Sequence, residues 1–216
     1  MEATIATIIA AAAPLLFATT GETISETAGV INLSLEGSLM LSALAGFAAA
    51  FETGNTWLGF VAAAAVGAAF AAIVAFSSIT LRLNQIAVGF VLAILGVALS
   101  SFLGSGYTGK PGGPIAVPPL DIPVLSDIPF VGPVLFSHNI VVYASIVVVG
   151  FTWWFMYRSR PGLALQGVGE RPEAAFSRGV HVNRLRYVYT IGGGALVGIG
   201  GAAFTLDVKL GWSFQH

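Results

Sequence analysis

Three polar side chains, Asn32, Ser34 and Glu36, interrupt an apolar stretch near the start of the chain. Their amide, hydroxyl and carboxylate groups can bind a polar solute, but they lack the nucleophile–base spacing of a hydrolytic centre. A charge at mid-membrane costs about 2.5–3.5 kcal/mol on insertion scales, so such residues usually face a bundle interior or a water-filled path. Three interpretations follow. The residues line a path, with Gly29 and Gly37 permitting a broken helix; or Glu36 lies near an interface; or the stretch is re-entrant.

Two further amides, Asn84 and Gln85, open another apolar segment. At a membrane boundary such side chains are commonly solvated by the interface. The alternative is a role in gating or substrate contact, and we therefore include both in a candidate translocation path.

Metal, cofactor and enzymatic functions find little support. The chain has no cysteine, and His138, His181 and His216 have no ligand-like spacing. A Gly-x-Gly-x-x-Gly pattern at Gly104–Gly109 has no preceding strand and no following helix, which dinucleotide binding requires. We predict no catalytic residue, no metal site and no cofactor.

The strongest concentration of charge is an arginine-rich stretch at 158–186. It holds six of the nine basic residues of the chain: Arg158, Arg160, Arg171, Arg178, Arg184 and Arg186. Because arginine and lysine concentrate in short cytoplasmic loops of membrane proteins, we expect this loop to face the cytoplasm.

The same loop contains the signals of a two-turn helix. Pro172 suits a first helical position, where an N–H would lack an intrahelical partner. Glu173 in the first turn and Arg178 in the last have the signs that the helix dipole favours. Gly179 can adopt the left-handed conformation that ends a helix. A short helix on such a loop is suited to contact a partner protein.

Composition determines the fold class. Of 216 residues, 56% are hydrophobic and 9% charged, and the net charge is −1. Soluble domains contain about 25% charged residues, so this is a polytopic membrane protein. The charge gives no case for nucleic acid binding. We predict an all-α bundle forming one transmembrane domain over 1–216 and embedded in membrane lipids.

Six apolar segments approach the roughly 20 residues that a spanning helix needs. They cover 3–20, 30–51, 57–81, 85–103, 139–157 and 187–206. Successive loops lie on opposite sides of the membrane. If the arginine-rich loop is inside, the linker 21–29 is also inside, and Met1 and the Pro/Gly-rich loop 104–138 are outside. That loop forms either an external docking surface or a plug over the bundle.

Small residues predict close helix contacts. Gly194 and Gly198 form a GxxxG pair in the last segment, and Gly67 and Ala71 are similarly spaced in the third. In lipid, helix association depends on van der Waals packing, which small residues allow.

Two motifs carry a family resemblance. Glu173-Ala174-Ala175 followed by Gly179 is similar to the EAA loop of importer permeases, and the preceding GLALQGVGERP includes Gly169 and Arg171. The segment from Glu26 to Gly37 is similar to one near the start of the same domain. The chain thus resembles permease subunits of ABC importers, of the nucleoside and simple-sugar group within the branched-chain amino acid/sugar permease family.

The resemblance implies a multi-pass subunit of the cytoplasmic membrane that is not itself an enzyme. Glu173, Ala174, Ala175, Gly179, Gly169 and Arg171 would couple it to cytoplasmic ATP-binding subunits. A nucleoside or simple sugar would pass along Asn32, Ser34, Glu36, Asn84 and Gln85. Further partners would be a second permease subunit and an external substrate-binding lipoprotein.

One departure from the family keeps alternatives open. Family members continue past the Gly-rich helix with further membrane helices, so we expect this domain to be C-terminally incomplete. The chain would then be a truncated or non-transporting fragment or scaffold. An ion-coupled secondary transporter is less suited, because on this segmentation Glu36 is the only acidic residue well inside a span.

Overall fold

The structure is a computed structural model that describes residues 2–112, 115–118, 120 and 138–213. Regular secondary structure in these residues is helical, apart from isolated bridges such as those that join Thr108 to Trp212 and Pro111 to Gly211. The predicted all-α class is confirmed.

Eight α-helices follow one another in the described residues. They are α1 (Glu2–Thr27), α2 (Leu35–Thr53), α3 (Thr56–Ala75), α4 (Gln85–Gly104), α5 (Ile140–Arg158), α6 (Arg160–Glu170), α7 (Pro172–Ser177) and α8 (Val182–Ala203). The π-helical turns η1 (Phe76–Thr80) and η5 (Phe204–Val208) extend α3 and α8, and the 3₁₀ turn η2 (Ser105–Tyr107) follows α4. Six of these helices are long and apolar enough to cross a membrane, the number predicted.

Several predicted boundaries are wrong at the end that carries the arginine-rich loop. The predicted linker 21–29 is helical as far as Thr27, and α2 begins at Leu35 instead of residue 30. The predicted loop 158–186 contains α6 as well as α7, and α8 begins at Val182 instead of residue 187. At this end of the bundle, charged residues that hydropathy alone assigns to loops therefore lie inside helices, where they contact other polar groups.

Asparagine starts three of the spanning helices. The side chain of Asn84 accepts hydrogen bonds from the backbone N–H groups of Ile86 (3.0 Å) and Ala87 (3.3 Å). Asn55 and Asn139 cap α3 and α5 in the same way. Such caps satisfy N–H groups that lack an intrahelical acceptor. Asn84 thus has a structural role independent of any substrate.

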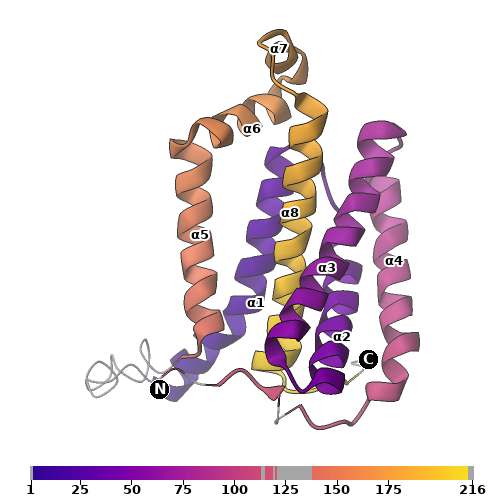
Figure 1. Cartoon of the computed structure of the whole chain (residues 1–216), viewed down its shortest axis with the longest axis vertical. Coiled ribbons are helices and arrows are strands. Elements are labelled where there is room, and N and C mark those ends of the chain that lie inside the picture. Colours follow the sequence, from indigo (N-terminus) through magenta and orange to yellow (C-terminus); the bar gives the residue numbers. More distant parts are fainter. Residues whose placement is uncertain (1, 113–114, 119, 121–137, 214–216) are drawn as a thin grey trace.

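Helix α8 lies at the centre of the bundle and packs against α1, α2 and α3 (Figure 1). Gly194 and Gly198 contact the α3 backbone around Gly67 and Ala63, as the small-residue spacing predicts. Elsewhere on α8, Gly193 contacts Gly21 of α1 and Gly201 contacts α2. Helix α4 packs on α2, and α5 packs mainly on α1 and α6.

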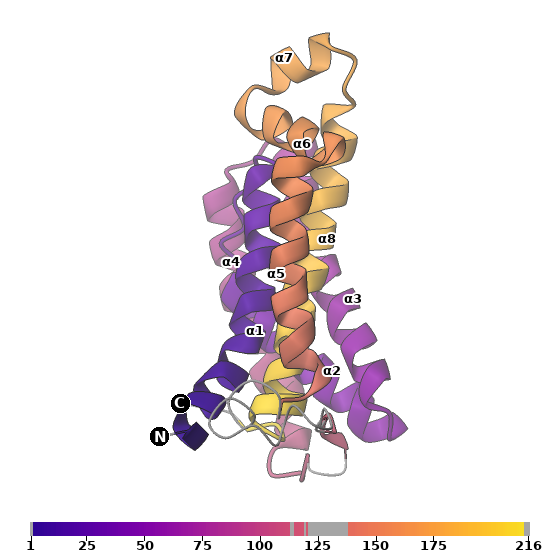
Figure 2. The same cartoon turned by 90° about the vertical axis from the view of Figure 1, so that its left-hand side faces the viewer.

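The two ends of the bundle differ in character. Figures 1 and 2 show α6 and α7 at one end and the chain termini at the other. At the end that carries the termini, Lys110 Nζ lies 4.7 Å from the ring centre of Phe51 and 4.6 Å from that of Tyr107. The Thr56 hydroxyl donates a hydrogen bond to the Ile115 carbonyl at 2.8 Å. The described part of the predicted external loop therefore packs onto the bundle. Residues 121–137 of this loop lie outside the described residues.

The α3–α8 contact gives a direct stability test. A Cβ added at Gly198 would lie 2.9 Å from the Ala64 Cα and closer still to the Ala63 backbone, whereas one at Gly192 would meet nothing within 4 Å. Overpacking costs about 1–3 kcal/mol. We expect Gly198→Ala to lower the thermal unfolding temperature in detergent and Gly192→Ala to leave it unchanged or raise it. Equal behaviour of the two variants would contradict the packing described here.

Candidate functional site at the α1–α2 link and the α6–α7 loop

The α1–α2 link, residues 28–34, is a non-helical connection between two candidate spans. Burial alternates along it: Ala28, Val30, Asn32 and Ser34 are buried, whereas Ile31 and Leu33 are exposed. Val30 packs with Phe70 and other residues of α3 and α4. A break in helical structure, which one of the three interpretations requires, is present from Ala28 to Ser34, whereas Gly37 lies inside α2. Asn32 and Ser34 are buried in the bundle.

Side chains satisfy the backbone of this link. The Gln85 side-chain oxygen accepts the Ile31 N–H at 2.8 Å, and the Glu22 carboxylate accepts the Asn32 N–H at 3.0 Å. The Asn32 side-chain oxygen accepts from the N–H (3.1 Å) and the hydroxyl (2.5 Å) of Ser34. In lipid an unpaired backbone group costs several kcal/mol, so these polar residues allow the chain to be non-helical here.

Arg186 holds the beginning of the link from α8. Its Nε donates to the Ala28 carbonyl at 3.1 Å and its Nη2 to the Gly29 carbonyl at 2.5 Å. On the α6 side, Gly169 contacts the Thr27 carbonyl so closely that an added Cβ would collide with it. The α6–α7 loop, by which we mean the arginine-rich stretch 158–186, therefore contacts the region of the link from both sides of α7: through Gly169 in α6 and through Arg186 in α8.

The predicted path residues are only partly brought together. Asn32 and Ser34 are hydrogen-bonded to each other, and Gln85 bonds the backbone of the neighbouring residue Ile31. Asn84 caps the helix that Gln85 starts. Glu36 is exposed in the first turn of α2, because α2 begins at Leu35. Its negative charge is favourable there, next to the helix N-terminus.

One prediction about acidic residues is wrong. Glu36 was expected to be the only acidic residue well inside a span, but it is the second residue of the candidate span Leu35–Thr53. Glu22 and Asp207 also lie in candidate spans, Thr4–Thr27 and Val182–Val208. Asp207 accepts a hydrogen bond from the side chain of Asn139. Among the described residues, no group of three or more His, Asp or Glu side chains could hold a metal ion.

Sequence reasoning missed Glu22 and Arg186. Glu22 was assigned to a linker because the first segment was ended after about 20 residues. Arg186 was counted as one more loop arginine. A single sequence does carry one signal, an acidic and a basic residue each within one turn of an apolar segment, but their partners are not visible in it.

The predicted short helix of the loop is confirmed as α7. Its C-terminus closes with Val180 N–H to Ala175 carbonyl (3.1 Å) and Gly179 N–H to Phe176 carbonyl (2.9 Å), and Gly179 has a φ of +83°. This is the Schellman arrangement, in which glycine avoids the strain of a left-handed residue.

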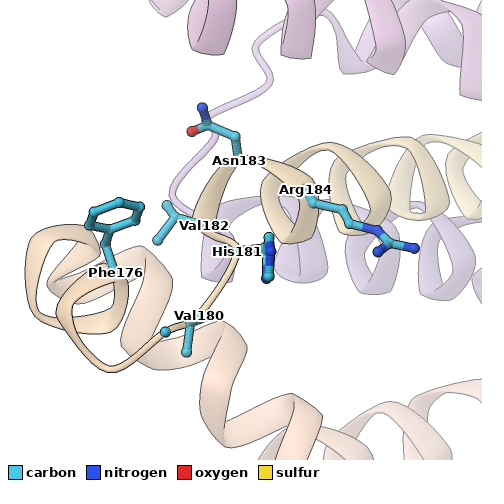
Figure 3. A pocket seen from close by; sticks show the side chains of 7 residues that line it. Phe176, Val180, His181, Val182, Asn183 and Arg184 are labelled. Atoms are coloured by element: carbon cyan, nitrogen blue, oxygen red, sulfur yellow. The ribbon is translucent and has the colours of Figure 1, made fainter.

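The residues of helix α7 lie on the surface of the protein. It has no buried residue, and Phe176 is 73% exposed. A pocket of about 530 Å³ lies beside it, lined by Phe176, Gly179, Val180, His181, Val182, Asn183 and Arg184 (Figure 3). Of the predicted coupling residues, Arg171, Glu173, Ala174 and Gly179 are exposed here, Ala175 is half-buried, and Gly169 faces the α1–α2 link. Phe176, missed at the sequence level, is the largest apolar group on this surface.

The helical bundle, its six candidate spans and the exposed loop helix define a multi-pass α-helical membrane protein. Residues 4–215 match the family model described as the permease component of branched-chain amino acid transport systems, and the chain belongs to this family.

Several relatives are similar over nearly the whole chain. A provisionally named glucose ABC transporter permease protein from Haloferax volcanii is 41% identical over 94% of this chain and 63% of its own length. A guanosine ABC transporter permease from Bacillus subtilis is 31% identical (95% and 67%), and a nucleoside ABC transporter permease from Lactococcus lactis is 30% identical (97% and 69%). The chain thus spans about two thirds of the length of these relatives. No solved structure matches it.

The Asn32 turn can be tested by substitution. Asn32→Ala removes the acceptor of two Ser34 hydrogen bonds inside the bundle. Leaving a buried donor unpaired costs about 1–3 kcal/mol. We expect the melting temperature in detergent to fall by about 2–10 °C.

Ser34→Ala is the matched control, because it keeps the backbone N–H bond to Asn32. Its effect on the melting temperature should be smaller. If Asn32→Ala melts at the wild-type temperature, the link is not held in the way described.

Proposed function

We propose that this chain is the membrane-spanning subunit of an ABC importer, and that it moves a nucleoside or a simple sugar with energy from ATP hydrolysed on a separate subunit. The observation that carries the proposal is α7, a capped helix at one end of the bundle with its Glu173, Ala174 and Phe176 side chains exposed. The names of the relatives, which give glucose, nucleosides and guanosine, support the substrate class.

In this proposal the end that carries α6 and α7 faces the cytoplasm. The concentration of arginine in the loop supports this orientation. Helix α7 would dock on an ATP-binding subunit through Glu173, Ala174, Ala175 and Gly179, with Phe176 as an apolar anchor. Aromatic side chains with large contact area often dominate such interfaces.

The opposite end would receive substrate from an external binding lipoprotein, and a second permease subunit would complete the path. Asn32, Ser34 and Gln85 supply amide and hydroxyl groups, which suit the hydroxyl-rich surface of a sugar or ribose. Glu36, exposed at the start of α2, would lie on the cytoplasmic side of the same region. The chain itself would be a non-enzymatic component of the assembly.

Co-purification with the candidate ATP-binding subunit tests the docking role. Glu173→Arg places a positive charge in the first turn of α7, where the helix dipole also disfavours it. We expect the wild type to retain the ATP-binding subunit and Glu173→Arg to lose it. Glu52→Arg makes the same charge change at an exposed position near the other end and should retain it. Failure of the wild type to bind would overturn the proposed function.

Phe176→Ala tests the apolar anchor separately from charge. Truncation of an aromatic hot spot costs about 2 kcal/mol or more, roughly thirtyfold in affinity. We expect weaker binding of the ATP-binding subunit in a titration, with an unchanged melting temperature because Phe176 is 73% exposed. Binding at wild-type affinity would assign docking to other residues.

A further inference from the structure

We propose that Arg186 is a positioning residue that, together with Gly169, passes movement of the α6–α7 loop to the α1–α2 link and so to the polar groups of the predicted path. The inference rests on the proposed function, since it assigns a route for the energy that an ATP-binding subunit would supply at α7.

The first step is the pair of hydrogen bonds from Arg186 to the link. A guanidinium holds its N–H donors in a fixed plane, so two bonds to successive carbonyls define both the position and the orientation of the acceptor. Arg186 makes two such bonds, to Ala28 and Gly29. These carbonyls directly follow α1, where the partial negative charge of the helix C-terminus attracts a cation. A rotation of α8 would therefore carry residues 28–29 with it.

The second step is the contact from the other side of α7. Gly169, in the last turn of α6, contacts both the Thr27 carbonyl and Gly29. No side chain fits between them, because an added Cβ at Gly169 would collide with the Thr27 carbonyl. Since α7 lies between α6 and α8 in the chain, a displacement of α7 reaches the link through both neighbours.

The third step leads from the link to the path residues. Its far half is bonded to α1 through Glu22 and Asn32, and to α4 through Gln85 and Ile31. Gly89 of α4 packs closely on the Leu33 backbone. A shift of residues 28–29 must therefore move Asn32 and Ser34 relative to Gln85, or strain these hydrogen bonds.

The residue after Arg186 makes a parallel connection. The Tyr187 hydroxyl is 2.5 Å from the Thr80 hydroxyl, at the end of η1. The short turn after η1 leads directly into Asn84 and Gln85. The start of α8 is therefore connected to both segments that carry the candidate path residues, the link and the beginning of α4.

The test uses the complete importer in lipid vesicles, with the ATP-binding subunit and the binding protein loaded with guanosine or glucose as probes. Arg186→Gln and Arg186→Lys are compared with Arg160→Gln, which removes an exposed arginine from the same loop. The measurements are retention of the ATP-binding subunit, ATPase stimulation by the loaded binding protein, and probe uptake.

We expect Arg186→Gln to retain the ATP-binding subunit but to lower the maximal stimulation and the uptake by about tenfold, because two bonds from a charged group are lost. The concentration of binding protein that gives half-maximal stimulation should not change. Arg186→Lys should recover part of the stimulation, since an ammonium can hold one carbonyl without fixing its orientation. Arg160→Gln should behave as wild type.

Wild-type stimulation and uptake in Arg186→Gln would overturn this inference while leaving the proposed function intact. Loss of assembly in both Arg186 variants would also overturn it, because Arg186 would then act in folding alone. A wild-type importer that neither binds the ATP-binding subunit nor transports either probe would overturn the proposed function itself.

Discussion

Close contact between helix backbones around α8 holds this bundle together. Lipid offers no hydrophobic drive for helix association, so helices must gain their stability from van der Waals contact. Glycines on several sides of α8 allow it to touch α1, α2 and α3 at backbone distance. The middle of α8 is held in consequence, and its start emerges from this packed region into the arginine-rich loop. The position of that loop depends on glycine packing deep in the bundle.

The same absence of water explains the polar residues of the α1–α2 link. A chain that leaves helical geometry inside a membrane needs partners for its N–H and carbonyl groups. Glu22, Gln85 and Arg186 supply them from three different helices. The polar residues that first indicate a path for a solute are therefore needed by the backbone as well. The two roles are compatible, because hydrogen bonds that hold the link also bring its amide and hydroxyl groups together.

How much the sequence could predict depends on whether the interacting residues are close together in the sequence. Six spans, the α7 helix between Pro172 and Gly179, and close packing at the small residues of the third and last segments were predicted correctly, because hydropathy, capping and small-residue spacing are local signals. Which helices these small residues bring together was not predicted. Nor were the length of α1 and the presence of α6. Glu22 resembles a linker residue until its partner Asn32 is known, and α6 contains Gly162, Gly167 and Gly169, which weaken a helical signal.

Arg186 shows the limit most clearly. Its type and place predict a solvated loop arginine, and only the fold brings it to carbonyls more than 150 positions earlier in the chain. Similarly, Glu36 is a polar residue in an apolar stretch, which suggests a path residue. Because α2 begins later than predicted, Glu36 instead lies in the exposed first turn of this helix. The position of Glu36 depends on where a helix begins, which a sequence places only to within a few residues. The position of Arg186 depends on the tertiary fold, which a single sequence does not reveal.

The packing of the two flanking helices determines how the α6–α7 loop can move. Helix α8 is held by three neighbours, whereas α5 packs mainly on α1 and α6 and lies at the edge of the bundle. Force applied at α7 should therefore displace the α5–α6 side more easily than α8. Gly169 would then be displaced further than Arg186, and both contact the link. The link contacts both elements, so unequal displacements on its two sides would become a relative movement of residues 28–34.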